Sequence, residues 1–301
     1  METNMSRFIS FGLIFTFFFS SHLMAKEFNV VTSVKPLQLI VQELTQGVTA
    51  PQVLLPAGAS PHDYALKPSD VKKIHDADLV IWVGPELETF MARILTNDVT
   101  NIALTSQSSI DFLYYDHDEE GDHTGHDHSH EGVDPHFWMG PKQSLQAATV
   151  ITDTLIDFDP LHKNEYKANL ALFEKSVNIA TDELKKQLQP VTQHGYFVFH
   201  DGYGYFEKYF KLNNLGHFTV KPDRRPGAKT LISIRRALQE KQAYCVFSEP
   251  QFSPAVVGSV VNGTGVSIGT LDPMATNIAY EQGGYIAFLQ ELGQSFTKCL
   301  K

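Results

Sequence analysis

A long amphipathic stripe constrains the fold of this chain more than any other feature. Between Pro160 and Gln189, apolar residues recur every three or four positions, the spacing of one face of an α-helix. The stripe consists of Tyr166, Leu170, Phe173, Val177, Ala180, Leu184 and Leu188. An unbroken helix of about 30 residues would be ~45 Å long, which is more than one lobe needs. The stripe therefore predicts a rigid helix that joins two lobes, with two shorter, kinked helices as the alternative.

Short apolar runs separated by helical patterns precede this helix. The strand-like runs cover residues 28–33, 52–55, 78–83 and 101–104. Helical patterns cover residues 36–46, 68–77 and 86–95. Strands that alternate with helices in this way favour a parallel sheet with helices on both faces.

A second set of runs follows the helix and repeats the alternation. Its strand-like runs cover 196–200, 215–220, 243–248 and 265–269, and its helical patterns cover 204–210, 230–240 and 285–296. We expect an α/β protein of two Rossmann-like lobes with mainly parallel sheets. The expected divisions are an N-terminal lobe over 26–158, a linking helix over 159–190 and a C-terminal lobe over 191–301.

Residues 1–25 have the pattern of a secretory signal peptide. Arg7 precedes an apolar run from Phe8 to Phe19, which is too short for a membrane span of ~20 residues. Ala25 is a small residue suited to cleavage, and no Cys near it could carry a lipid anchor. We expect export without a lipid anchor; the alternative is a retained N-terminal anchor.

The chain has two cysteines, Cys245 and Cys299. An oxidising compartment favours a disulfide between them. In the chain-entropy model, closing a loop of about 54 residues would stabilise the fold by roughly 4 kcal/mol. Two buried thiols are the alternative.

The acidity of the chain is concentrated in one segment. Residues 116–134 contain eight acidic residues and no Lys or Arg, which accounts for most of the net charge of −10. Five of the 13 histidines also lie there, namely His117, His123, His126, His128 and His130. Such a segment (116–133) is too polar to bury a core, so we expect a loop. Neutral imidazoles suit zinc, copper or nickel, which indicates secondary metal capture; a solvated acidic loop is the alternative. The negative net charge argues against nucleic-acid binding.

Three other histidines and one aspartate form a second group of candidate ligands, and three of these four residues closely follow a predicted strand. His62 follows the run that ends at residue 55, His200 ends the run over 196–200, and Asp272 follows the last run. His136 comes directly after the acidic segment. Ligands of open α/β sheets bind at the carboxyl edge of the strands, and three imidazoles with one oxygen form a suitable tetrahedral zinc set. A metal site built from both halves of the chain is therefore predicted, although a lone histidine is more often structural. The remaining histidines of the expected mature chain, His75, His162, His194 and His217, are interpreted as surface or packing residues.

Several spaced motifs resemble one family over essentially the whole mature chain. They are residues 31–37 (VTSVKPL), 61–64 (PHDY), 134–138 (DPHFW), 199–203 (FHDGY), 247–251 (FSEPQ) and 271–273 (LDP). Together they resemble the metal-specific solute-binding proteins, in particular the periplasmic zinc-binding components of ABC importers.

The resemblance implies two α/β lobes joined by a long helix, with one metal in the cleft between them. His62, His136 and His200 match the three histidine ligand positions of the family. A His-rich acidic loop is typical of its zinc members, and their disulfide matches Cys245 and Cys299 in placement.

The implied activity is that of a carrier and not of an enzyme. A monomer in the periplasm would capture Zn²⁺ with high affinity, as its transported ligand. It would deliver the ion to an inner-membrane ABC permease that works with a cytoplasmic ATPase.

The chain departs from the family pattern at one position. Some zinc members have a Glu near the first ligand histidine, where this chain has Pro61 before His62. The fourth ligand is then a water or Asp272, which matches a carboxylate ligand of manganese relatives. Alternative functions are a manganese-binding or adhesin-type member of the family, or an exported zinc hydrolase. The sequence contains no His-Glu-x-x-His motif, which argues against the hydrolase.

Overall fold

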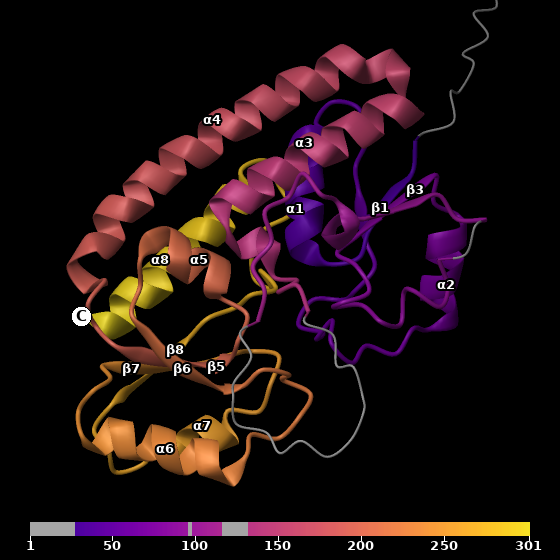
Figure 1. Ribbon diagram of the computed structural model, residues 1–301. Helices are drawn as coiled ribbons and strands as arrows, with labels where there is room; N and C mark the ends of the chain where they lie inside the picture. Colours follow the sequence, from indigo (N-terminus) through magenta and orange to yellow (C-terminus); the bar gives the residue numbers. More distant parts are fainter. Residues whose placement is uncertain (1–27, 96–97, 116–131) are drawn as a thin grey trace, which may run out of the picture.

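The computed structural model of the protein describes residues 28–95, 98–115 and 132–301 (Figure 1). The expected signal peptide and the five histidines between residues 117 and 130 lie outside these ranges. The described residues form two lobes, each built on a four-stranded parallel sheet, as the sequence predicts. None of the described helices is long and apolar enough to cross a membrane.

The N-terminal sheet has the strand order β2-β1-β3-β4, with every pair parallel. Its strands are β1 (Val30–Thr32), β2 (Gln52–Val53), β3 (Leu79–Trp82) and β4 (Asn101–Ala103), and its first helices are α1 (Lys35–Leu44) and α2 (Pro68–His75). The central strands β1 and β3 are fully buried, as expected for a parallel sheet with both faces covered. A proline in the first turn starts each of α1 and α2.

The C-terminal sheet has the order β6-β5-β7-β8 and is also parallel throughout. Its strands are β5 (Tyr196–His200), β6 (Asn214–Thr219), β7 (Cys245–Ser248) and β8 (Ser267–Thr270). Its helices are α5 (Gly204–Phe210), α6 (Ala228–Gln239), α7 (Ala255–Val261) and α8 (Gly284–Leu300). Figure 1 shows α6 and α7 on one face of this sheet and α5 and α8 on the other.

The joining helix α4 (Lys163–Leu188) is unbroken and is flanked by 3-10 turns at Pro160–His162 and Gln189–Val191. The prediction of one continuous helix is confirmed. Six residues of the apolar stripe are buried and Leu170 is partly buried. The stripe packs against α1, α3 (Pro141–Phe158) and α8, and α4 runs from one lobe to the other (Figure 1). Gly293 of α8 lies against Leu184, where a β-carbon would clash.

Two parts of the sequence interpretation differ from the structure. Residues 86–95 form successive turns and not the expected helix. The buried Glu88 carboxylate accepts the N–H groups of Val83 (2.9 Å) and Gly84 (3.3 Å), which holds the segment in a turn after β3. Burial raises the pKa of Glu88 to about 7. Helices α3 and α7 were not expected.

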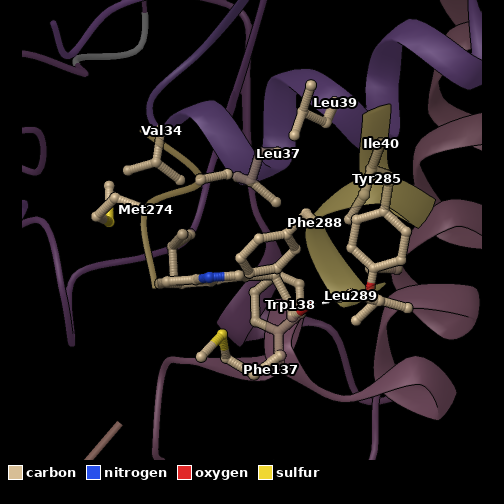
Figure 2. Packing of buried hydrophobic residues seen from close by; sticks show 14 of the residues in the cluster. Val34, Leu37, Leu39, Ile40, Phe137, Trp138, Met274, Tyr285, Phe288 and Leu289 are labelled. Atoms are coloured by element: carbon tan, nitrogen blue, oxygen red, sulfur yellow. Dashed lines mark hydrogen bonds between the residues drawn. The ribbon is translucent and has the colours of Figure 1, made fainter. Parts of the chain in front are cut away.

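One hydrophobic cluster spans both lobes (Figure 2). Leu37 and Ile40 of α1 pack with Trp138 and with Tyr285 and Phe288 of α8. The Trp138 indole N–H also donates to the carbonyl of Pro273 (2.9 Å), in the segment that leaves the C-terminal sheet. The lobes are therefore held together by shared packing as well as by α4.

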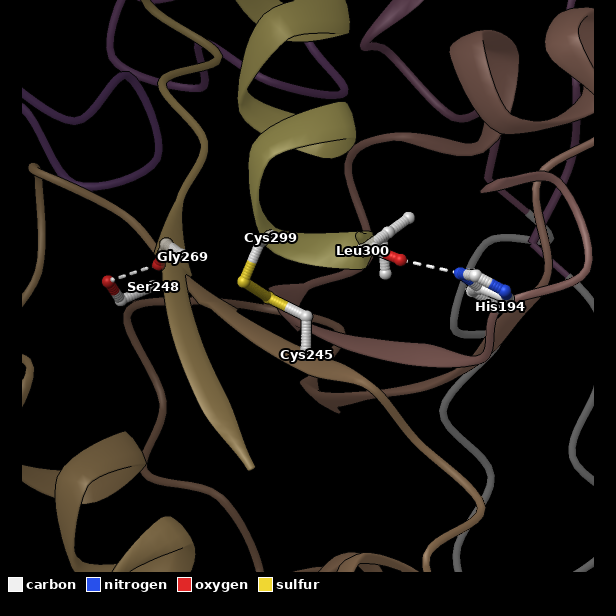
Figure 3. Close-up of a disulfide and its surroundings, with 6 residues drawn as sticks. All are labelled: His194, Cys245, Ser248, Gly269, Cys299 and Leu300. Atoms are coloured by element: carbon white, nitrogen blue, oxygen red, sulfur yellow. Dashed lines mark hydrogen bonds between the residues drawn. A yellow bond between two sulfur atoms is a disulfide. The ribbon is translucent and has the colours of Figure 1, made fainter. Parts of the chain in front are cut away.

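The predicted disulfide is present and joins Cys245 of β7 to Cys299 of α8 (Figure 3). The two Cα atoms are 5.8 Å apart, and the two cysteines are 54 positions apart in the sequence. The bond attaches the end of α8 to the C-terminal sheet, while the start of the same helix packs in the N-terminal core. Beside it, the His194 ring contacts the Leu300 carbonyl (2.5 Å).

Candidate metal centre

Three histidines meet between the lobes. His62 lies in the loop between β2 and α2, His136 immediately precedes a 3-10 turn at Phe137–Met139, and His200 is the last residue of β5. The His136 Nε2 atom is 3.2 Å from His200 Nε2 and 3.4 Å from His62 Nε2. The ligand atoms of the three rings all lie within 4.8 Å of one another, so they can share one small ion.

Carboxylates fix the far side of two of these rings. The His136 Nδ1 atom lies 2.8 Å from Asp134 Oδ1, and the His200 Nδ1 atom lies 2.6 Å from Glu249 Oε1. A carboxylate accepts hydrogen bonds, so each Nδ1 donates its N–H to the carboxylate and each Nε2 is the nitrogen left to bind a metal. A metal-binding histidine needs this neutral tautomer.

The sheet explains why Glu249 meets His200. Strands β5 and β7 are neighbours, and Val198 pairs with Phe247 in parallel register. Two residues further along, at the carboxyl edge, the same register brings Glu249 beside His200. Asp134 reaches His136 locally, because its carboxylate also accepts the backbone N–H of His136 (3.0 Å).

Burial sets the charge state of the rings. His136 and His200 are each 2% exposed, and His62 is partly buried. Desolvation, together with the neighbouring rings, lowers the pKa of His62 to about 2 and that of His136 well below its usual value. For His200, burial acts in the same direction, but the Glu249 carboxylate outweighs it and raises the pKa. His62 and His136 are therefore neutral near pH 7, and of the three rings His200 holds a proton most readily.

The three rings line a cavity of about 10 Å³, together with Glu249, Gln251 and other residues. This volume corresponds to about one water-sized sphere. The cavity can therefore hold one small ion.

Asp272 does not join the convergent group. Its Oδ1 accepts the Gln251 amide N–H (2.7 Å) and the Met274 backbone N–H (3.0 Å), and its Oδ2 accepts the Thr276 backbone N–H (2.6 Å). Among the His, Cys, Asp and Glu side chains of the described ranges, the convergent set near the cleft is His62, His136 and His200.

The remaining described histidines have other partners. His162 contacts Asp159 (2.6 Å), His194 stacks on Tyr244, and His217 faces Asp201 (3.7 Å). His75 is exposed at the end of α2. Their interpretation as surface or packing residues agrees with these positions.

Sequence reasoning did not assign the orienting roles of Asp134 and Glu249. The Asp-Pro-His motif could have indicated the first, because an aspartate two residues before a histidine can reach its ring. Finding Glu249 requires knowing that β5 and β7 are neighbours.

Comparison with known proteins gives one family. The family model described as "Zinc-uptake complex component A periplasmic" (ZnuA) matches residues 30–299. A protein of Yersinia pestis named "High-affinity zinc uptake system protein ZnuA" is 44% identical over 305 residues, covering 94% of this chain and 96% of the relative. The protein of the same name in Haemophilus influenzae is 34% identical over 336 residues, covering 98% and 99%.

Solved structures share the fold at lower identity. A structure titled "Crystal structure of ZnuA" matches with a TM-score of 0.77 at 24% identity, covering 91% of this chain and 99% of that chain. The solute-binding protein FpvC of Pseudomonas aeruginosa, solved with Mn²⁺, matches with a TM-score of 0.76 at 19% identity, covering the same shares. At these identities the likeness shows the fold alone.

Proposed function

Because the chain belongs to the ZnuA family of periplasmic zinc-uptake components, we propose that it captures Zn²⁺ in the periplasm and delivers it to an ABC-type permease of the inner membrane. His62, His136 and His200 are the proposed ligands. The observation that carries the proposal is the convergence of their Nε2 atoms. The Nε2 atom of His136 lies 3.2 Å from that of His200 and 3.4 Å from that of His62. The protein acts as a carrier, and Zn²⁺ is its cargo.

The donor set favours zinc. Three neutral imidazoles and one open position match a tetrahedral zinc site, whereas manganese prefers carboxylate and other oxygen ligands. Among the described residues, no carboxylate oxygen joins the three ring nitrogens. We propose a water as the fourth ligand.

Asp134 and Glu249 act as positioning residues in this proposal. Each holds one ligand ring in the tautomer and orientation that binding requires. The distance from carboxylate oxygen to ring Nδ1 is 2.8 Å for Asp134 and 2.6 Å for Glu249. Outer partners of this kind also increase the basicity of the ligand nitrogen. They allow two ligands to be positioned before the metal arrives.

The core supports release without a wide hinge motion. The cluster around Trp138 and helix α4 spans both lobes, so large rotation of one lobe would disrupt packing. The permease must instead lower zinc affinity locally. His62 is the natural point of action, because it lies on a loop and is the more exposed ligand.

The histidines of the acidic segment are proposed as a secondary capture site. His117, His123, His126, His128 and His130 lie outside the described residues, so their role rests on composition. Imidazoles interleaved with carboxylates bind borderline metals loosely, which would raise the local zinc concentration near His136.

Zinc titration in competition with a chelator tests the proposal. The mature protein is expected to have one tight site that His136→Ala and His200→Ala remove while the fold is retained, as judged by circular dichroism. Tight binding that survives both substitutions would refute the assigned ligands. Cell fractionation tests the periplasmic location, and zinc-limited growth of a deletion strain tests the transport role.

A further inference from the structure

The side chain of Gln251 is held in one orientation at the edge of the metal cavity. Its amide nitrogen lies 2.7 Å from Asp272 Oδ1 and 3.2 Å from Thr276 Oγ1. Asp272 Oδ1 also accepts the Met274 backbone N–H, so this oxygen acts as an acceptor. The amide must therefore present its NH₂ group to Asp272, which fixes the carbonyl oxygen on the opposite side.

The carbonyl oxygen of Gln251 is buried and has no hydrogen-bond partner among the described residues. Gln251 also lines the cavity that contains the rings of His62, His136 and His200. Buried polar atoms in folded proteins are nearly always hydrogen-bonded. An oriented acceptor without a partner at the wall of a metal cavity points to a donor that arrives with the metal.

We propose that the Gln251 carbonyl accepts a hydrogen bond from the water that completes the zinc coordination. Asp272 and Thr276 then act by orienting the Gln251 amide, and Asp272 is not itself a ligand. This inference rests on the proposed zinc site and specifies how its fourth position is held. A zinc-bound water is a strong hydrogen-bond donor, because the ion lowers its pKa, and a neutral carbonyl stabilises it without adding a second charge.

If Asp272 were itself a zinc ligand, the expected results would differ. To bind the metal, its carboxylate would have to leave Gln251 and two backbone N–H groups, of Met274 and Thr276. Loss of a ligand also changes the metal geometry, whereas loss of an orienting contact leaves the geometry intact. The two roles can thus be separated by affinity and by spectroscopy.

The experiment compares Gln251→Leu, Asp272→Ala, Asp272→Asn and the double variant Gln251→Leu/Asp272→Ala with the unmodified mature protein. Zinc affinity is measured by chelator competition, and the dissociation rate by transfer to excess chelator. Cobalt(II) absorption reports the coordination geometry. Gln107→Leu is the matched control, because its amide donates to the Ala103 carbonyl (3.1 Å) and the residue does not line the cavity.

Gln251→Leu is expected to lower zinc affinity about 10-fold, the lower end of the range for outer-shell partners, and to speed dissociation. Asp272→Ala should cause a similar loss of affinity. The double variant should lose no more affinity than either single variant, since both changes act on the same amide. The cobalt bands should keep the intensity of a tetrahedral site. Asp272→Asn should restore part of the affinity, because its carbonyl can still accept the Gln251 N–H, although its NH₂ group replaces the oxygen that accepts the Thr276 N–H.

Unchanged affinity and dissociation in Gln251→Leu would overturn the proposal. Additive losses of affinity in the double variant would also overturn it. Altered cobalt bands in Asp272→Ala, without rescue by Asp272→Asn, would overturn it by showing that Asp272 is a ligand. If the unmodified protein has no tight zinc site, or if His200→Ala keeps it, the proposed function itself fails. Tight binding that depends on His200 but not on Gln251 would refute only this inference.

Discussion

His136 and His200 differ from His62 in how the protein holds them. The first two are almost completely buried, and a carboxylate fixes the far nitrogen of each ring. His62 lies on a loop and is partly exposed, and in the described part of the chain no carboxylate pairs with its ring. Two ligands are thus positioned in advance and the third can adapt. A carrier that must bind tightly and later release its ion needs both kinds.

Removing a ligand should have the largest effect and should separate the two kinds. His136→Ala and His200→Ala are expected to lower zinc affinity by more than about 100-fold, beyond the usual range for outer-shell changes. Each also leaves a buried carboxylate without its imidazole partner, which should lower the unfolding free energy of the metal-free protein by about 1–3 kcal/mol.

His62→Ala should also weaken zinc binding but leave the metal-free stability unchanged, because no carboxylate depends on this ring. Urea unfolding of the three metal-free variants measures this difference. Equal destabilisation by all three would contradict the distinction between fixed and adaptable ligands.

Weakening one orienting carboxylate should make a fixed ligand behave like the adaptable one. Glu249→Gln is expected to lower zinc affinity by about 10- to 100-fold. The amide oxygen can still accept from His200 Nδ1, but it lacks the charge that increases the basicity of the ring. Chelator competition measures the loss, and affinity equal to that of the unmodified protein would show that the carboxylate has no role in binding.

Among the three ligand rings, proton competition with zinc near neutral pH should come from His200. His62 and His136 have lowered pKa values and do not compete for protons near neutrality, whereas Glu249 raises the pKa of His200 above its usual value. Zinc must displace the His200 proton, so affinity should fall by about tenfold per pH unit below that pKa and level off above it.

Glu249→Gln should move this decline to lower pH, because the charge that raises the pKa is removed. Titrations between pH 5 and 8 (about the range in which histidines titrate) give the profile. A decline at the same pH in both proteins would assign the proton to another group.

Deleting residues 116–131 should have the smallest effect on the cleft. The three proposed ligands, Asp134 and Glu249 remain, so the affinity of the tight site should be unchanged, while weaker zinc binding is lost with the five histidines. Calorimetric titration measures both. A weakened tight site would mean that this segment contributes to the cleft itself, and unchanged zinc uptake at limiting zinc would exclude a feeding role.

Features with strong periodicity could be predicted from the sequence. The apolar stripe of α4 and the continuous apolar run of β5 each depend on residues close in the chain. The sequence pattern does not indicate helix α3, because its threonines, valine and isoleucines are weak helix formers and packing against α4 supplies its stability. The sequence pattern predicts a helix where turns form over 86–95, because the interaction of Glu88 with Val83 and Gly84 has no periodic signature.

The candidate metal site could likewise be predicted only in part from the sequence. His62, His136 and His200 could be proposed because they follow strand ends or a distinctive segment, and the structure brings their Nε2 atoms together. The pairing of Glu249 with His200 depends on the register of β5 and β7. The contacts of Asp272 with Gln251 and the following turn depend on side-chain geometry. Neither can be read from one sequence.

The most direct test of the account is a competition titration with zinc and with manganese on protein lacking residues 116–131, beside the same protein carrying His200→Ala. The account predicts one tight zinc site, much weaker manganese binding, and loss of the tight site in the variant. Manganese binding equal to or stronger than zinc binding, or a tight zinc site that survives His200→Ala, would contradict it.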